Sequence, residues 1–207
     1  MRAPVIATGS NSKGDLRAWL AQLVGEGRLA VATENLSLRH ELAAVAKRLE
    51  REQAVLFPKP DGHAVPVVAN LLADRSWVAD AIGVPERELL GRFEHAARHP
   101  LPCVEVTDAP VQAVVHRKPD LTKILPIPVH NELDSGPYIT AGLMIARNPR
   151  TGVQNVSIHR CQVSGPDRIG VLLLPRHTQA YYRMAEEAGD GLEIALVVGV
   201  HPIHLLD

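Results

Sequence analysis

Aromatic residues make up only 3% of this 207-residue chain, and only two cysteines are present, Cys103 and Cys161. So few aromatic rings argue against a surface that stacks nucleic-acid bases. The two cysteines stand far apart and form no CxxC pair, so the disulfide framework of a small secreted protein is excluded. We therefore expect a reduced, cytoplasmic setting.

The chain also lacks an excess of either charge and any long apolar run. Lys and Arg number 22, Asp and Glu number 23, and the net charge is −1, so no general attraction to nucleic acid or to an anionic membrane is expected. Residues 1–13 contain no apolar segment of signal-peptide length, and we interpret them as a flexible lead-in. No apolar run approaches the roughly 20 residues of a membrane-spanning helix.

Several well-known catalytic motifs are missing. The sequence contains no GxGxxG, GxxxxGK[ST], HExxH or GxSxG pattern. Ordinary dinucleotide binding, nucleoside-triphosphate binding and catalytic-triad chemistry therefore lack support. The apolar share of 46% and the charged share of 22% are those of an ordinary globular protein.

The first hundred residues alternate between helical and strand-like patterns. Leu16, Trp19, Leu20 and Leu23 recur at helical spacing, with Ser12 as a candidate cap and glycines at 25 and 27 as stops. A second apolar stripe over 38–49 predicts another helix, and two more are expected near 71–82 and 85–98. Short strands are predicted at 29–32, 54–57 and 65–68, the last at an edge or an end because it contains Pro66.

After the proline-rich stretch 99–102, the pattern changes to short strands separated by turn residues. Strands are predicted at 104–107, 112–116, 138–147, 153–163, 170–174 and 193–200, with a helix near 177–188. This spacing favours an antiparallel sheet or barrel. Gly152 is expected to take a positive φ in the hairpin loop 148–152. The strand 193–200 is continuously apolar after Glu193 and calls for cover on both faces, so the chain looks cut, or like one part of a larger assembly.

The segment from 134 to 160 holds the first candidate site. Asn155, Ser157 and Arg160 lie within six positions, and such a set can hold a phosphate, a metal or a carboxylate. If 153–163 is a strand, Asn155 and Ser157 project to one face and Arg160 to the other, unless a bulge intervenes. The alternative is an exposed polar strand without a ligand. The turn 134–138 is explained by Gly136 and Pro137 alone.

The second candidate is His177, with Arg176 before it, at the start of the predicted helix 177–188. An imidazole can ligate a metal, and a helix N-terminus favours an anion nearby. The alternative is a solvent-facing histidine at a helix start. His201 and His204 are interpreted as structural, because Pro202 between them disfavours the helical spacing that a metal pair needs.

Several segments together resemble the UbiD family, whose members are reversible decarboxylases that use prenylated FMN. They are DLRAWLAQLVGEGRL, AVLF, VPVVANLLADRSWVADAIGV and ILPIPVHNELDSGPYITAGLMIARNPRTGVQNVSIHR. The resemblance runs from about Asp15 to the end of the chain. It implies an α+β fold, with an N-terminal α/β domain over 14–105. A flavin-reductase-like split β-barrel domain over 106–207, incomplete at its C-terminal end, would bind the prenylated FMN.

The same resemblance implies roles for seven residues. Asn155 and His177 would ligate a divalent metal, Mn²⁺ or Mg²⁺, with K⁺ as a further cation, next to the cofactor phosphate. Arg160 would be the catalytic arginine that positions the substrate carboxylate. The flavin and its phosphate would lie against Asn155, Ser157, Ile158, His159, Arg160, Arg176 and His177.

Two departures from the family pattern stand out. Ser135 occupies the place of the second glycine in the family's D-G-G element. Family members are also much longer, and the glutamate that completes their metal site and the two acidic residues that act in proton transfer lie in parts this chain does not have. General acid catalysis needs a donor within hydrogen-bond reach, and no residue here can be assigned that role.

Three readings follow. The chain could be the N-terminal portion of a non-oxidative carboxy-lyase that releases CO₂ from aromatic, heteroaromatic or α,β-unsaturated acids. It could be a naturally short subunit completed by a second chain. It could instead be a non-catalytic subunit that binds flavin or phosphate, or serves assembly. The resemblance further implies a flavin prenyltransferase as cofactor supplier and a homo-oligomer or a two-chain assembly. Composition and hydropathy predict no nucleic-acid partner and no membrane span.

Overall fold

The computed structural model describes residues 14–206, so the predicted lead-in 1–13 and the candidate cap Ser12 lie outside the described residues. In the first half, a three-stranded sheet is made of β1 (Leu29–Val31), β2 (Ala54–Phe57) and β3 (Val67–Ala69). Strands β1 and β2 run parallel, and β3 pairs with β2 in the antiparallel sense. The helices of this half are α1 (Leu16–Gly25), α2 (Glu41–Arg48), α3 (Arg75–Ile82) and α4 (Leu89–Arg98), with 3-10 turns η1 (Pro60–Gly62) and η2 (Glu86–Glu88).

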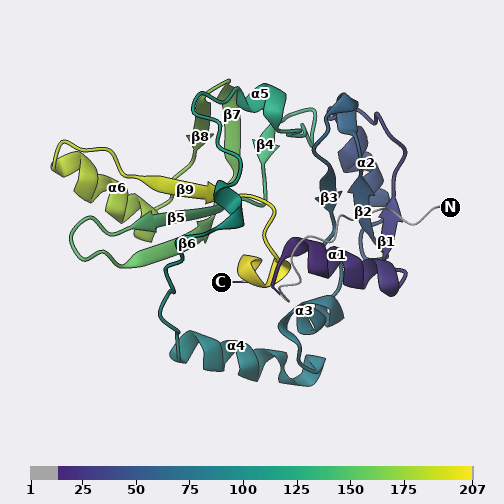
Figure 1. Cartoon of the computed structure of the whole chain (residues 1–207), viewed down its shortest axis with the longest axis horizontal. Helices are drawn as coiled ribbons and strands as arrows, with labels where there is room; N and C mark the ends of the chain where they lie inside the picture. Colours follow the sequence, from purple (N-terminus) through teal and green to yellow (C-terminus); the bar gives the residue numbers. More distant parts are fainter. Residues whose placement is uncertain (1–13, 207) are drawn as a thin grey trace.

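The central strand β2 divides the core of this half into two sides. Successive strand residues point to opposite faces. Ala54 packs in a cluster with Trp19, Leu23 and Trp77 from α1 and α3. Val55 and Phe57 pack on the other side with Leu42 of α2 and its neighbours. The sheet therefore lies between α2 on one face and α1 with α3 on the other (Figure 1).

Helix α1 begins at a capping aspartate. Asp15 Oδ1 accepts a hydrogen bond from the backbone N–H of Ala18 at 2.7 Å. We expect Asp15→Ala to lower the free energy of unfolding by about 1 kcal/mol, because a donor of the first turn loses its partner. Urea unfolding followed by circular dichroism measures this change. Asp15→Asn, which keeps an acceptor, and Arg17→Ala, at an exposed position of the same turn, should each cost much less; equal losses in all three would argue against capping.

Helix α2 starts later than its apolar stripe predicts. Leu38 lies before the helix, and its carbonyl accepts a hydrogen bond from the N–H of Val129 at 2.9 Å. The N–H of His40 donates to the carbonyl of Val129 at 3.0 Å, and His40 has a left-handed backbone with φ 71°. This short bridge joins the two halves of the chain and delays the helix until Glu41.

The second half forms two three-stranded antiparallel sheets around one core. One sheet has the order β4 (Tyr138–Ile139), β7 (Cys161–Gly165), β8 (Arg168–Val171), and the other has the order β6 (Gln154–Ile158), β5 (Leu143–Arg147), β9 (Ile194–Val197). Ile139, Met144, Cys161 and Val163 from both sheets pack together. The remaining elements are η3 (Pro110–Gln112), α5 (Leu121–Ile124), α6 (His177–Glu187) and η4 (Pro202–Leu205).

The expected antiparallel architecture is present, but the strands are shorter than predicted. The predicted strands 138–147 and 153–163 each break into two, because the chain passes from one sheet to the other at 140–142 and again at 159–160. At the first crossing, a Cβ on Gly142 would lie 2.8 Å from Leu196 Cδ1, so a larger residue there would require the Leu196 side chain to move. The described residues form a mixed α/β fold with small sheets and no closed barrel, so the split barrel is not confirmed.

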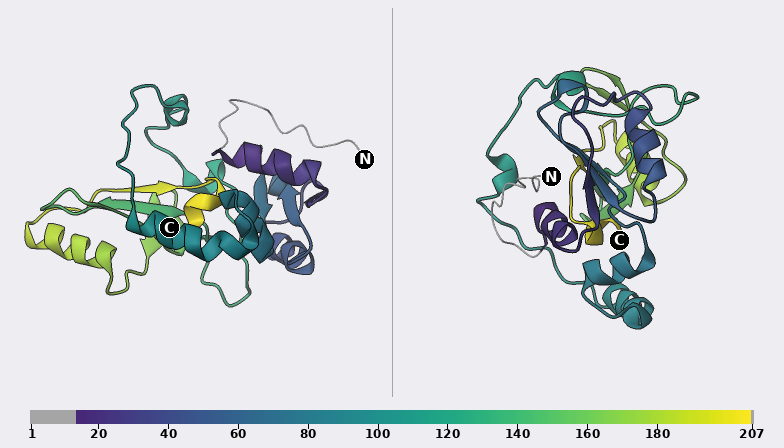
Figure 2. Two further views of the ribbon diagram at one scale, coloured as in Figure 1. Left: turned by 90° about the horizontal axis from the view of Figure 1, so that it is seen from below. Right: turned by 90° about the vertical axis from the view of Figure 1, so that its right-hand side faces the viewer.

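The predicted strands 104–107 and 112–116 are wrong. This segment forms an extended loop with the single turn η3, set apart from the sheets (Figure 2). Its apolar side chains are exposed, for example 83% for Val104 and 73% for Val114. An alternating pattern produces a strand only where a partner strand accepts its hydrogen bonds, and none pairs with it among residues 14–206.

The C-terminal end returns to the first half. His201 is buried and its ring meets Trp19 edge-on at 5.7 Å, while η4 lies against α3 (Figure 1). His201 Nδ1 accepts a hydrogen bond from the N–H of Ile203 at 3.2 Å, as expected for a structural histidine. Every helix within residues 14–206 is too short or too polar to span a membrane.

Candidate functional site

The hairpin of β5 and β6 positions the first candidate residues. Its loop is held by Asn148 Oδ1, which accepts from the N–H groups of Arg150 and Thr151 at 2.8 and 3.1 Å, and Gly152 takes the predicted positive φ of 74°. The resulting register pairs Asn155 with Ala146 and Ser157 with Met144. The loop thereby fixes which face of β6 presents these two side chains.

Helix α6 covers that face. It packs on β5 and β6 and buries Thr178, which is only 3% exposed. Asn155 Nδ2 donates to Thr178 Oγ1 at 3.3 Å, and the hydroxyls of Ser157 and Thr178 lie 3.1 Å apart. The prediction that Asn155 and Ser157 share one face is therefore confirmed. Thr178 was missed in the sequence, although its place directly after His177 in the first helical turn was a usable signal.

His159 joins the same polar cluster. Its Nε2 lies 3.0 Å from Ser157 Oγ, which also donates to the carbonyl of Met144 at 3.4 Å. Ile158 lies between the two and is 49% exposed, on the opposite face of β6 by strand alternation. Four polar side chains, Asn155, Ser157, His159 and Thr178, thus form one hydrogen-bonded group beneath the start of α6.

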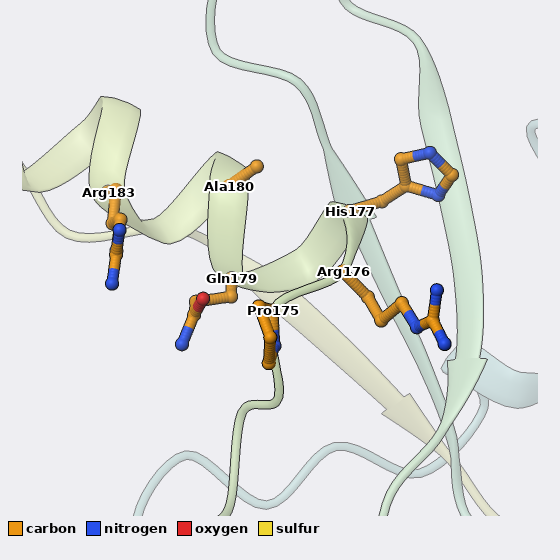
Figure 3. Close-up of a pocket in the computed structure, with 6 residues that line it drawn as sticks. All are labelled: Pro175, Arg176, His177, Gln179, Ala180 and Arg183. Carbon is orange, nitrogen blue, oxygen red and sulfur yellow. The ribbon is translucent and has the colours of Figure 1, made fainter.

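The start of α6 borders an open cleft of about 450 Å³. Figure 3 shows Arg176 and His177 pointing to one side of the helix start, and Gln179 and Arg183 pointing to another. Arg176 and His177 are both exposed. Arg176 and the N–H groups at the N-terminus of α6 make this a favourable place for an anion such as phosphate.

Arg160 is held by a different part of the chain. It lies in the connection between β6 and β7, where its Nη2 donates to Asp134 Oδ1 at 2.8 Å. Its guanidinium carbon lies 4.3 Å from the ring centre of Tyr138. The hydrogen bond from Arg160 holds the pKa of Asp134 below its usual value. The turn 134–138 is thus more than a connection, because two of its side chains engage the candidate catalytic arginine.

The donors present fit a divalent cation in part. Because Asn155 Nδ2 is engaged by Thr178, the amide oxygen is left for a hard cation, which prefers oxygen ligands. His177 offers an exposed imidazole at the start of α6. Within residues 14–206, no three His, Cys, Asp or Glu side chains gather as a metal site. Asn155 and His177 would therefore supply only part of the ligands that a divalent cation needs.

Two family models match the chain. The 3-octaprenyl-4-hydroxybenzoate carboxy-lyase N-terminal domain matches residues 20–97, and the Rift-related domain of the same carboxy-lyase matches residues 103–207. The chain belongs to the UbiD family. The resemblance noted in the sequence is confirmed, and the relatives and structural neighbours of this UbiD-family chain include several decarboxylases.

Three comparisons illustrate the match. Anhydromevalonate phosphate decarboxylase of Methanothermobacter thermautotrophicus is 37% identical over 88% of this chain and 42% of its own length. The UbiD-class enzyme HmfF of Pelotomaculum thermopropionicum, solved in complex with FMN, is 47% identical with a TM-score of 0.88 over 90% of this chain and 43% of its own. An evolved dimeric form of HmfF with prenylated FMN is 46% identical, with a TM-score of 0.88 over 91% and 45%.

The coverage percentages also show what share of each relative's length this chain matches. The UbiD-family chain spans about two fifths of the length of the relatives it matches. The matched part contains the hairpin β5–β6 and the start of α6, and therefore all seven candidate site residues.

Proposed function

We propose that this chain supplies the cofactor- and metal-binding part of a non-oxidative, reversible decarboxylase that uses prenylated FMN. The observation that carries the proposal is the polar group of Asn155, Ser157, His159 and Thr178 beneath the N-terminus of α6. It occurs in a chain whose backbone matches FMN-bound HmfF with a TM-score of 0.88. The substrates would be aromatic, heteroaromatic or α,β-unsaturated carboxylic acids, with CO₂ as the shared product.

Each candidate residue then has a defined task. Arg176 and the first turn of α6 bind the cofactor phosphate, because the helix N-terminus and the guanidinium both favour an anion. Asn155 and His177 ligate Mn²⁺ or Mg²⁺ beside that phosphate, and K⁺ is a further candidate cation. Ser157 and His159 would contact the flavin from the face of β6 under α6, and Ile158 would contribute from the opposite, exposed face. Thr178 orients Asn155 by accepting from its Nδ2.

Arg160 binds the substrate carboxylate. A guanidinium presents a planar set of N–H donors that matches a carboxylate and keeps its charge at any working pH. Prenylated FMN, when bound, supplies the electron-accepting ring system that makes loss of CO₂ feasible. The residues of this chain orient the acid against that ring and hold its charge.

The proton donor is assigned to a part of the protein beyond these residues. The substrate carbon must receive a proton after CO₂ leaves, from a group within hydrogen-bond reach. Asp134 is the carboxyl group beside Arg160, but its lowered pKa keeps it ionised and makes it a poor proton donor. We assign the proton donor and the acidic metal ligand to later residues of the same protein or to a partner chain.

The proposal extends to the setting of the enzyme. Residues 14–105 would form the N-terminal α/β domain and 106–207 the cofactor-binding split-barrel domain. A flavin prenyltransferase would supply the cofactor in the cytoplasm. A homo-oligomer is supported by the evolved dimeric form of HmfF with prenylated FMN. Completion by a second chain is supported by the vanillic acid decarboxylase ShVdcCD of Sedimentibacter hydroxybenzoicus, which includes the component ShVdcD.

The test compares the 207-residue chain with the protein made from its whole gene. Both are produced with a flavin prenyltransferase and Mn²⁺, and CO₂ release is measured on furan, hydroxybenzoate and cinnamate-type acids. We expect both to bind the flavin and only the second to release CO₂. Turnover by the 207-residue chain alone would contradict the incomplete site. Flavin binding without turnover by either protein would favour the non-catalytic binding subunit.

A further inference from the structure

Arg160 occupies a position that would leave an ordinary arginine mobile. It lies in the two-residue connection between β6 and β7, and its side chain is 61% exposed. A long, exposed side chain of this kind samples many rotamers, and fixing it costs conformational entropy. An arginine that must hold its planar N–H donors in place for a substrate carboxylate therefore needs support from its neighbours.

The first support is a carboxylate that is itself anchored. Asp134 is only 15% exposed, and its two oxygens have different partners. Oδ2 accepts from the backbone N–H of Asn131 at 3.1 Å, and Oδ1 accepts from Arg160 Nη2 at 2.8 Å. The turn is closed further by Asn131 Oδ1, which accepts from the N–H of Leu133 at 3.0 Å. The carboxylate is therefore fixed to the backbone before it meets the guanidinium.

The second support is the aromatic ring of Tyr138, whose backbone and hydroxyl group are both held by neighbouring residues. Tyr138 lies in β4, which pairs with β7 opposite Gln162, and its hydroxyl lies 2.9 Å from Ser135 Oγ. Gln162 Nε2 also donates to the carbonyl of Ser135 at 3.2 Å. The ring thus presents its face to the guanidinium of Arg160 at 4.3 Å, in the range of a cation–π contact.

We propose that Asp134 and Tyr138 are positioning residues that hold the Arg160 guanidinium ready for the substrate carboxylate, an inference that rests on the proposed decarboxylase function. Asp134 occupies Nη2, and within residues 14–206 no side chain or backbone group accepts from Nε or Nη1. One edge of the guanidinium is therefore anchored while other N–H groups stay available. The negative charge of Asp134 opposes binding of an anionic substrate, so orientation is gained at some loss of affinity.

Because Asp134 orients Arg160 but repels an anionic substrate, its removal is expected to change kcat and KM in different ways. In the protein loaded with prenylated FMN and Mn²⁺, we expect Asp134→Asn to lower kcat about tenfold, because the guanidinium loses its charged anchor. KM for the acid should stay the same or fall, because a repelling charge is removed. Tyr138→Leu should lower kcat similarly, and Tyr138→Phe, which keeps the ring, should restore most of it. Glu187→Gln, which breaks the exposed pair with Arg150, is the matched control.

A second measurement does not depend on activity. The Nε–H group of Arg160 can be followed by ¹⁵N relaxation in the 207-residue chain. We expect it to be as rigid as the strand backbone in the wild type, and more mobile in Asp134→Asn and Tyr138→Leu. Arg150 should be mobile throughout, since its pair with Glu187 is exposed on both sides.

The outcomes separate this inference from the proposed function. A mobile Arg160 in the wild type, or a normal kcat in Asp134→Asn and Tyr138→Leu, overturns the positioning role and leaves the decarboxylase proposal standing. Normal turnover without Arg160 overturns the assignment of Arg160 in the proposed function. If the loaded protein has no turnover at all, the relaxation data still decide whether Asp134 and Tyr138 immobilise the arginine.

Discussion

We expect Arg160→Ala to abolish decarboxylation by the loaded protein while leaving the flavin bound. The guanidinium is the group that would bind the substrate carboxylate, and its loss removes both the charge and the fork. A loss of about a thousandfold in kcat/KM is expected, at the upper end for removal of one strong donor. Turnover is measured by loss of the acid, and bound flavin by its absorbance after gel filtration.

Two further variants make this result specific. Arg160→Lys keeps the charge but not the planar fork, so it should recover only a small part of the activity. Arg150→Ala removes an arginine from an exposed pair and should keep normal turnover. Circular dichroism shows whether each variant folds. If Arg160→Ala loses its fold, the residue is structural, and if it turns over normally, the catalytic assignment is wrong.

The second large effect concerns the metal. We expect His177→Ala to weaken Mn²⁺ binding by at least about a hundredfold, because an imidazole ligand is removed and even outer contacts of metal sites are worth tenfold or more. Asn155→Ala should weaken binding too, since the amide oxygen is lost. Electron paramagnetic resonance of free and bound Mn²⁺, measured with the flavin present, gives the affinities.

The control for metal binding removes an imidazole at a different position of the chain. His99 is exposed and stacks on His95 at the end of α4, so His99→Ala removes an imidazole far from α6 in the sequence and should leave Mn²⁺ binding unchanged. Thr178→Val should have an intermediate effect, because Asn155 then loses the partner that orients it. Unchanged affinity in both His177→Ala and Asn155→Ala would show that the metal lies elsewhere.

Local patterns predicted the elements that depend on local chemistry. Helix α1 follows from the spacing of Trp19 and Leu23, and β2 from the apolar run 54–57. Pro66 correctly indicated an edge or an end, because β3 begins directly after it and lies at the edge of its sheet. Strand boundaries after residue 100 could not be predicted in the same way. Whether an alternating segment pairs, breaks or stays a loop depends on a partner strand distant in the sequence.

In the candidate site too, local patterns predicted the features that depend on neighbouring residues and missed those that depend on distant strand pairing. Strand alternation was enough to place Asn155 and Ser157 on one face, and the helix start at His177 was visible in the sequence. The ion pair of Arg160 with Asp134 was not, because the two residues are 26 positions apart and meet only through the pairing of β4 with β7. The crossing between two sheets, which isolated patterns cannot reveal, decides where Arg160 lies.

The contact between His201 and Trp19 has a consequence for synthesis of the chain. Trp19 leaves the ribosome long before the ring that meets it, because His201 lies 182 positions later in the sequence. The core around Trp19 and Leu23 can therefore begin to form early, but one side of it stays uncovered until His201 has also been translated. Since N-terminal units usually fold first, we expect a nascent chain ending before His201 to expose this tryptophan to chaperones and proteases.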